Sequence, residues 1–284
     1  TARAADIVRE ALAQGRTILT EPEAKDVLSA YGIPVVETRI ARDVDAAVHA
    51  AHAIGYPVAI KVLSPDITHK SDVGGVALDL ESDEALREAG TRMLTRIGQL
   101  RPQARLEGFS VQKMTRRPQA HELIIGVTTD PVFGPVVLFG QGGIAVEVTA
   151  DHAVALPPLN AVLARDMIQR TRVAKLLAGY RHRPAADLDA IVHVLMKISQ
   201  LVADLPELVE LDINPLLADS EGAIVLDARI GVALADKSAS TLDRLAIRPY
   251  PRELEQEIVW DGAPLTLRPI RPEDGEAHLA FASA

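Results

Sequence analysis

A lysine and two glycines flank a polar loop around residues 64–73, and together they have the chemistry of a phosphate-binding segment. Lys61 follows the apolar run at 58–60, and Gly74 and Gly75 end the loop just before a second apolar run at 76–80. Glycine lets backbone N–H groups approach anionic oxygens, and lysine supplies a compact positive charge. The alternatives are a solvated lysine at a strand end and a hairpin bend at the two glycines.

Residues 112–114 and Glu122 are suited to the base and sugar of a nucleotide. Gln112, Lys113 and Met114 end a strand before a polar break, so their backbone groups can meet an adenine edge while the methionine packs on the ring face. Glu122 begins the next apolar segment and can accept hydrogen bonds from ribose hydroxyls or orient Lys61. An ordinary edge strand and a surface carboxylate are the alternatives.

A second glycine-rich loop follows the apolar run at 135–139. Gly142 and Gly143 belong to the segment Gly140-Gln141-Gly142-Gly143. Glycines in a strand context weaken the strand, so they predict a close approach of a ligand or of another backbone. Phosphate contact and a tight turn both fit this pattern.

The segment 210–214 and Asp227 carry the oxygen ligands of a metal site. On a strand Glu210, Asp212 and Asn214 share one face, because side chains alternate with a period of two. Asp227 ends the apolar run at 224–226, which is typical of an antiparallel partner strand. A few protein oxygens completed by phosphates and water suit Mg²⁺, so Asp212, Asn214 and Asp227 are the predicted metal ligands.

His69 lies in the polar loop between Lys61 and Gly74 and is the candidate catalytic residue. A neutral imidazole near pH 7 can accept a phosphoryl group as a nucleophile. A solvated loop histidine is the alternative.

The elements that must position these residues alternate between helix and strand. Thr20-Glu21-Pro22-Glu23 has the spacing of a capping box, and apolar residues then recur with helical period up to Gly32. Further helices are expected at 43–54, 82–97, 160–169, 172–178 and 186–205, and strands at 33–40, 58–63, 76–80, 109–114, 122–128, 135–139, 144–148, 208–213 and 223–228. The fold class is therefore α/β or mixed α+β.

Composition excludes several function classes. The chain of 284 residues is long enough for two lobes, and its 48% hydrophobic and 24% charged residues are ordinary for a soluble globular protein. A net charge of -9 argues against a nucleic-acid partner. No cysteine occurs, so disulfides and a cysteine nucleophile are excluded. With no apolar run of about 18 residues and no signal-peptide pattern, no membrane partner and a cytoplasmic location are expected.

The ordered motifs resemble the ATP-grasp domain of the NDP-forming (ADP-forming) acyl-CoA synthetases over residues 17–235. The resemblance rests on Leu19-Thr20-Glu21 with Ala24-Lys25, on the segments 57–61 and 69–76, on 139–147, and on 210–216 with Asp227. It implies an ATP-grasp fold in which two lobes clasp ATP or ADP with Mg²⁺. It also implies that Lys61 holds phosphate, that 112–114 lie at the adenine, and that His69 is a phosphoryl-shuttling histidine.

The chain departs from that family at its C-terminal end, where Leu265 to Glu273 resembles the first strand and helix start of the GNAT-type N-acetyltransferases. The combination is similar to multidomain lysine acetyltransferases that fuse a synthetase-like region to an acetyltransferase. The expected organisation is a helix or tail at 1–16, an ATP-grasp domain at 17–237 with lobes at 17–110 and 111–237, a linker at 238–262 and a truncated acetyltransferase start at 263–284.

Two functions follow from the resemblance. The first is ATP-dependent phosphoryl transfer through His69 for acyl-CoA formation, with a CoA-binding synthetase domain and an acetyltransferase domain in the same parent chain as partners. The alternative is a catalytically silent module that senses nucleotide for the acetyltransferase.

Overall fold

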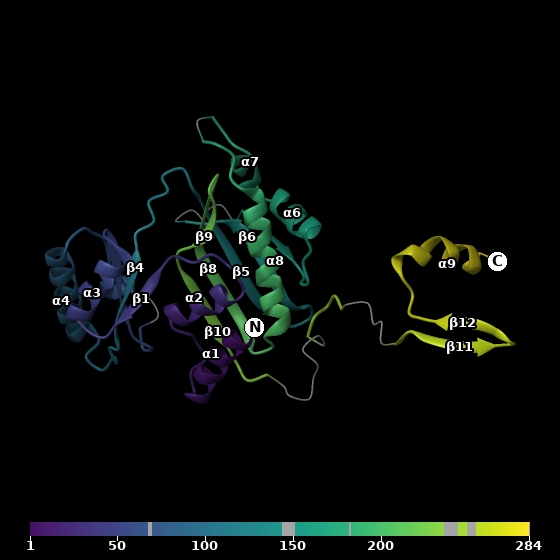
Figure 1. Ribbon diagram of the computed structural model, residues 1–284, viewed down its shortest axis with the longest axis horizontal. Coiled ribbons are helices and arrows are strands. Elements are labelled where there is room, and N and C mark those ends of the chain that lie inside the picture. Colours follow the sequence, from purple (N-terminus) through teal and green to yellow (C-terminus); the bar gives the residue numbers. More distant parts are fainter. Residues whose placement is uncertain (68–69, 144–150, 182, 236–243, 249–253, 284) are drawn as a thin grey trace.

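The first lobe is built on a four-stranded antiparallel sheet in the order β1-β4-β2-β3 (Figure 1). This computed structural model describes residues 1–67, 70–143, 151–181, 183–235, 244–248 and 254–283. The strands are β1 (Thr38–Ala41), β2 (Val58–Leu63), β3 (Val76–Leu80) and β4 (Gly108–Lys113), and the helices are α3 (Val44–Ile54) and α4 (Asp83–Leu100). A short 3₁₀ turn, η1 (Ser71–Val73), precedes β3.

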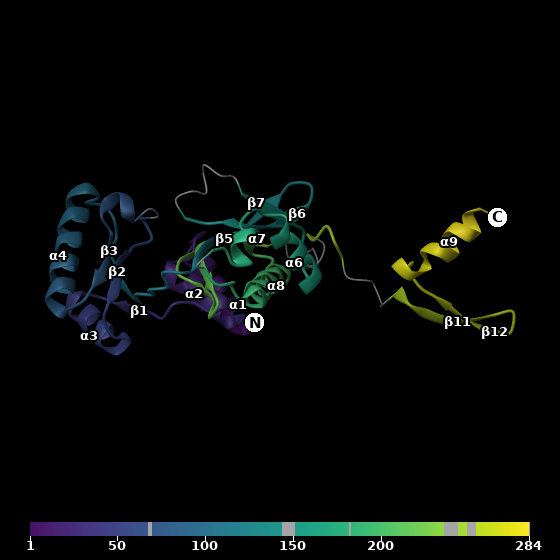
Figure 2. The same cartoon turned by 90° about the horizontal axis from the view of Figure 1, so that it is seen from above.

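Period two along β2 divides its side chains between the two faces of this sheet. Val58, Ile60 and Val62 face α3 and α4 and form a buried core with them. Lys61 projects from the other face, where its ammonium group contacts residues of the second lobe. Figure 2 shows both helices on the side of the sheet that is turned away from the second lobe. The sheet face that carries Lys61 is thus the face available to a ligand held between the lobes.

The second lobe is built on a larger antiparallel sheet in the order β10-β8-β5-β6-β7, with β9 paired to β8. Its strands are β5 (His121–Asp130), β6 (Gly134–Gln141), β7 (His152–Ala155), β8 (Leu208–Asp219), β9 (Gly222–Val225) and β10 (Ala228–Val232). Its helices are α1 (Ala2–Ala13), α2 (Glu21–Ala30), α6 (Ala161–Gln169), α7 (Ala174–Leu177) and α8 (Leu188–Asp204).

The core of the second lobe lies between one face of this sheet and the helices. Leu123, Ile125 and Val127 of β5 are buried in it together with Ile191 and Leu195 of α8. Residues at alternate positions of β5 and β8 lie on the opposite face, which is open toward the first lobe. The predicted alternation of Glu210, Asp212 and Asn214 is present there, because the intervening Leu211 and Ile213 are buried.

Helix α2 joins the two lobes, although the sequence analysis assigned all of 17–110 to the first lobe. Its capping box forms as predicted between Thr20 and Glu23. Ala24, Val27 and Leu28 are buried in the core of the second lobe. The apolar face of α2 therefore belongs to the second lobe, and its polar face is free to meet the first.

Several strands differ from the predicted ones. The strand expected at 33–40 is reduced to 38–41, and β7 was not predicted because its four residues are too few for a period. The run at 223–228 is split into β9 and β10, with Asp227 between them. The strand predicted at 144–148 lies outside the described residues.

The linker predicted at 238–262 contains a strand. β11 (Gln256–Trp260) pairs with β12 (Ala263–Leu267) through Asp261 and Gly262, which both have positive φ. Asp-Gly is a strong signal for this kind of two-residue hairpin turn, and the prolines upstream of it dominated the linker prediction.

The C-terminal part ends in η3 (Pro272–Asp274) and α9 (Gly275–Ala282), which are drawn in yellow in Figure 1. None of its described residues belongs to either core, and its apolar side chains Val259, Trp260 and Phe281 are exposed. Across the described part of the chain, no helix has the length and apolar character needed to cross a membrane.

Candidate functional site

The lobes enclose a polar cavity of about 280 Å³. The first lobe contributes the loop after β2, with Ser64 and Lys70, and the second contributes the start of α2 and the strands β8 and β10. The lining residues are Ile18, Leu19, Thr20, Glu21, Leu63, Ser64, Pro65, Ile67, Lys70, Asp212, Asn214, Asp227, Ala228 and Arg229. Positively charged side chains and oxygen atoms that could bind a metal ion therefore line the same cavity.

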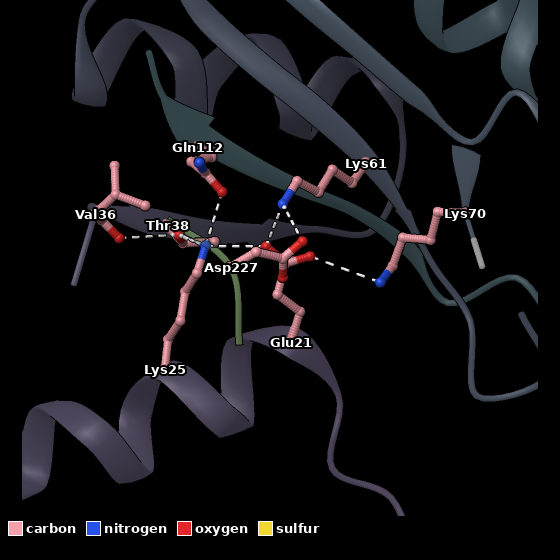
Figure 3. Close-up of polar contacts among 8 residues, drawn as sticks. All are labelled: Glu21, Lys25, Val36, Thr38, Lys61, Lys70, Gln112 and Asp227. Atoms are coloured by element: carbon pink, nitrogen blue, oxygen red, sulfur yellow. Dashed lines mark hydrogen bonds and ion pairs between the residues drawn. The ribbon is translucent and has the colours of Figure 1, made fainter. Parts of the chain in front are cut away.

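Glu21 lies at the centre of a cluster of three ammonium groups (Figure 3). Its Oε1 accepts hydrogen bonds from Lys61 Nζ at 2.6 Å and from Lys25 Nζ at 2.9 Å. Lys70 Nζ lies 3.6 Å from Oε2. Lys61 also donates to Asp227 Oδ2 at 3.3 Å, so it bridges carboxylates of α2 and of the β9–β10 connection.

Electrostatics keeps this cluster ionised. Burial alone would raise the pKa of Glu21, but Lys25, Lys61 and Lys70 outweigh it and lower the pKa to about 2. Burial likewise opposes the charge of Lys61, but Glu21 and Asp227 outweigh it and raise its pKa. Glu21 and Lys61 therefore form a charged pair at neutral pH.

Lys25 anchors the cluster rather than lining the cavity. It is only 2% exposed, and its Nζ donates to Gln112 Oε1 at 2.7 Å and to Thr38 Oγ1 at 3.1 Å as well as to Glu21. Burial lowers its pKa, although Glu21 partly compensates. These bonds carry the polar face of α2 across to β1 and β4, so the interface between the lobes is a network of hydrogen bonds and ion pairs.

The opposite wall supplies oxygen ligands. Asp212, Asn214 and Asp227 all line the cavity. Burial raises the pKa of Asp212, and the nearby carboxylates of Glu210 and Asp227 raise it further, while Arg229 opposes them. A divalent cation would relieve this repulsion, and oxygen donors are what Mg²⁺ prefers, so the donor set fits the predicted metal.

The protein ligands alone do not enclose a metal. Within the described residues no group of three or more histidine, aspartate or glutamate side chains could hold an ion. A site here needs oxygen atoms from a ligand as well as from Asp212, Asn214 and Asp227, as the sequence analysis assumed.

Gly74 and Gly75 determine the conformation of their own loop. Gly74 has φ +70°, and a Cβ there would lie 2.9 Å from the side chain of Arg96. A Cβ on Gly75 would lie 2.7 Å from Val62 Cγ1. Gly74 N donates to Ser71 O and Gly75 N to Lys70 O, so both N–H groups are bonded within the loop. Both glycines therefore shape the turn that presents Lys70, while phosphate contact by their backbone stays a prediction.

Gln112 and Lys113 are the last residues of β4, and Met114 directly follows it. The side chain of Gln112 is buried against Lys25. Lys113 N donates to Glu37 O and Met114 N to Pro57 O, while Lys113 Nζ donates to Ile54 O. Their backbone N–H groups are thus already paired, and an adenine contact by these residues stays a prediction.

The second glycine loop packs against Glu122. Gly142 N donates to Glu122 O at 2.8 Å, and a Cβ on Gly142 would lie 2.7 Å from the carbonyl carbon of Leu123. Gly143 has φ +78°, and a Cβ there would collide with Glu122 Oε2. The glycines therefore let the chain pass close to β5 and to the carboxylate of Glu122.

His69 lies outside the described residues, directly before Lys70. Glu21, Lys25, Lys70 and Arg229 lie at the site although no site role was predicted for them. Arg229 follows Asp227 at a spacing of two, which signals the same face of a strand, and it pairs in register with Asp212. Glu21 was predicted to start a helix and to belong to the family motif, but its contacts with Lys61 and Lys70 join segments far apart in sequence.

Comparison with known proteins identifies relatives for most of the chain. The family described as ATP-grasp domain matches residues 10–232. The beta subunit of acetate–CoA ligase [ADP-forming] I from Pyrococcus furiosus is 40% identical over 229 residues, which cover 81% of this chain and 97% of that subunit. Acetate–CoA ligase [ADP-forming] I from Archaeoglobus fulgidus is also 40% identical, but the match spans only 33% of its length.

Solved structures show the same fold. A Ca. Korarchaeum cryptofilum dinucleotide-forming acetyl-coenzyme A synthetase 1, in complex with coenzyme A, Ca-AMPCP and HgCl⁺, matches with a TM-score of 0.77 and 39% identity over 80% of this chain and 99% of that one. A second structure of that enzyme holds coenzyme A and Mg-AMPPCP, with its phosphohistidine segment pointing towards the nucleotide-binding site. It matches with a TM-score of 0.71 and 37% identity over 81% of this chain and 100% of that one.

Proposed function

This chain belongs to the ATP-grasp domain family, of the type found as the beta subunit of ADP-forming acetate–CoA ligases, and from that premise we propose that it binds Mg-ATP or Mg-ADP between its lobes for phosphoryl transfer in acyl-CoA formation. The observation that carries the proposal is the cavity between the lobes, where Lys70 and Arg229 meet Asp212, Asn214 and Asp227. Relatives solved with adenine-nucleotide analogues support it.

The residues divide the work by chemistry. Lys61 and Lys70 supply positive charge to phosphate oxygens. Their ammonium groups stabilise the negative charge that is redistributed over these oxygens during phosphoryl transfer. Asp212, Asn214 and Asp227 would hold Mg²⁺, which when bound neutralises phosphate charge. Glu122 and the strand at 112–114 are the proposed contacts for ribose and adenine.

His69 is the proposed phosphoryl carrier. Phosphorylation of His69 forms a bond between phosphorus and an imidazole nitrogen, and the bond from that phosphorus to its previous donor breaks. With ATP as the ultimate donor, ADP leaves with the bridging oxygen. A coenzyme A-binding synthetase domain in the same parent chain is the proposed partner, because the single-chain relatives extend well beyond the matched region.

Thermal melting tests the nucleotide site. We expect Mg-ADP at about 100 times its dissociation constant to add about 2.7 kcal/mol to the free energy of unfolding, which raises Tm by about 5–10 °C. Lys61→Ala should reduce this shift. Lys175→Ala, an exposed lysine in α7, is the matched control and should leave it unchanged. Equal shifts in wild type and Lys61→Ala would contradict the assignment of Lys61.

Labelling tests the role of His69. In the presence of a coenzyme A-binding synthetase domain, radiolabelled γ-phosphate should appear on wild type and not on His69→Ala. Equal labelling of both proteins would refute the carrier role. A nucleotide-dependent melting shift without any labelling would instead favour the nucleotide-sensing module.

We also propose that residues 263–284 begin a GNAT-type N-acetyltransferase domain that follows a linker. The exposure of Leu265, Leu279 and Phe281 supports this, because such apolar side chains need a core that the described part of the chain does not supply. Transfer of acetyl groups from acetyl-CoA to lysine peptides by the parent chain tests the proposal, and an inactive parent chain would contradict it.

A further inference from the structure

The two oxygens of Glu21 have unequal partners. Oε1 accepts hydrogen bonds from both Lys25 and Lys61. Oε2 is buried and accepts no hydrogen bond from any described residue, and Lys70 Nζ lies 3.6 Å from it. Burying a carboxylate oxygen without a hydrogen bond costs free energy. Only the charge of Lys70 holds its contact with Oε2.

Lys70 is the lysine of this cluster that lines the cavity. Lys25 and Lys61 each donate a hydrogen bond to Glu21, whereas among the described residues Lys70 contacts Glu21 only as an ion pair. An ammonium group held in this way is available to an anion that enters the cavity.

Glu21 and two of its three lysine partners come from different lobes. Glu21 belongs to α2, whose apolar face is packed in the second lobe, whereas Lys61 and Lys70 belong to the first. Glu21 presents to these lysines the same chemistry as a phosphate, namely anionic oxygens 2.6–3.6 Å from their ammonium groups.

We propose that Glu21 is the internal counterion of the phosphate site, a positioning residue that competes with nucleotide phosphates for Lys70 and holds Lys61 in place. Lys70 changes partner when phosphate binds, because it has no hydrogen bond to Glu21 and lines the cavity. Lys61 stays against Glu21 and is thereby held at the phosphate site from the second lobe. The inference rests on the proposed nucleotide binding.

The competition between Glu21 and phosphate affects the affinity for the phosphate groups of a nucleotide but not the affinity for its base. Glu21→Gln keeps the side-chain shape and one acceptor oxygen but removes the charge that opposes a phosphate. We expect the ratio of the adenosine to the Mg-ADP dissociation constant, measured by titration calorimetry on the full chain, to rise about tenfold. Adenosine affinity itself should stay within about twofold, because adenosine carries no phosphate.

Lys25→Met is the matched control. It removes a member of the same buried cluster that does not line the cavity, so general damage to the interface between the lobes would affect both variants alike. We expect Lys25→Met to lower Tm without raising the ratio. Lys70→Met provides a second test that leaves the hydrogen bonds of Glu21 to Lys25 and Lys61 in place, and it should lower the ratio several-fold.

The outcomes distinguish this inference from the proposed function. Wild type that binds Mg-ADP, together with an unchanged or lowered ratio in Glu21→Gln, overturns the counterion role and leaves the nucleotide site in place. If Glu21→Gln fails to fold, an unchanged ratio in Lys70→Met overturns it instead. Wild type that binds no nucleotide at all refutes the proposed function and this inference together.

Discussion

Neutralising Glu21 should change the acid sensitivity of the whole protein. Its pKa is lowered from 4.5 to about 2 in the folded chain, so the folded state holds this proton more weakly than the unfolded state. A carboxyl group of this kind stabilises the fold above its unfolded pKa and loses that contribution as the pH falls toward its folded pKa. The window for Glu21 therefore runs from about pH 4.5 down to about pH 2.

The expected magnitude follows from the size of the shift. One pKa unit corresponds to about 1.4 kcal/mol, so the ionised Glu21 contributes on the order of 3 kcal/mol at neutral pH. The side chain is only 3% exposed, which keeps solvent screening small. Glu21→Gln should lower the free energy of unfolding by that amount at about pH 7, and by about 1.4 kcal/mol less at about pH 3.5.

Urea unfolding at several pH values measures this difference. Far-ultraviolet circular dichroism is the suitable signal, because the single tryptophan, Trp260, lies in the C-terminal hairpin and not in either lobe. Asp26→Asn on the same helix removes an exposed ion pair to Arg3 and, as the control, should change the free energy of unfolding by less than about 1 kcal/mol. A gap between wild type and Glu21→Gln that stays constant from neutral pH to about pH 3.5 would refute the electrostatic account.

Two further substitutions test the packing that supports the site. Arg244 donates hydrogen bonds to four carbonyl oxygens at and just beyond the end of α8, those of Val202, Leu205, Pro206 and Leu208. Arg244→Ala should therefore lower the free energy of unfolding by about 2 kcal/mol and Tm by about 4–8 °C in a melting experiment. An unchanged Tm would contradict this capping role. Gly142→Ala should cost about 1–3 kcal/mol, because its Cβ would press on the backbone of Leu123. Gly98→Ala in α4, where a Cβ meets nothing within 4 Å, is its control and should be neutral or slightly stabilising. Equal losses from both glycine substitutions would show that the close approach at Gly142 is unimportant.

Local patterns in the sequence were sufficient for most of the elements. The capping box at Thr20 and Glu23 forms as predicted, and the alternation of Asp212 and Asn214 with buried Ile213 places both on one open face. These features depend on neighbours a few positions apart, which periodicity reports directly. The ATP-grasp fold inferred from the order of the motifs is confirmed by the relatives and by the solved structures.

Other features depended on contacts that no local pattern encodes. The first pair of glycines had two interpretations in the sequence, and the structure shows that Gly74 and Gly75 form bonds within their own loop. The hydrogen bond from Lys25 to the side chain of Gln112 was not predicted, because the two residues lie far apart in the chain. The strand β11 was missed even though Asp261 and Gly262 signal a hairpin, because the prolines upstream of it favoured an extended linker.

By itself, the sequence determined the fold class and the family resemblance, and it predicted phosphate binding by Lys61 and metal binding by Asp212, Asn214 and Asp227. Only the tertiary structure decided which charges meet. It packs the apolar face of α2 in one lobe and turns Glu21 toward Lys61 and Lys70 of the other. The physical reason is that helix and strand periods act over a few residues, whereas the energy of a buried ion cluster depends on distances of about 3 Å between segments that only folding brings together.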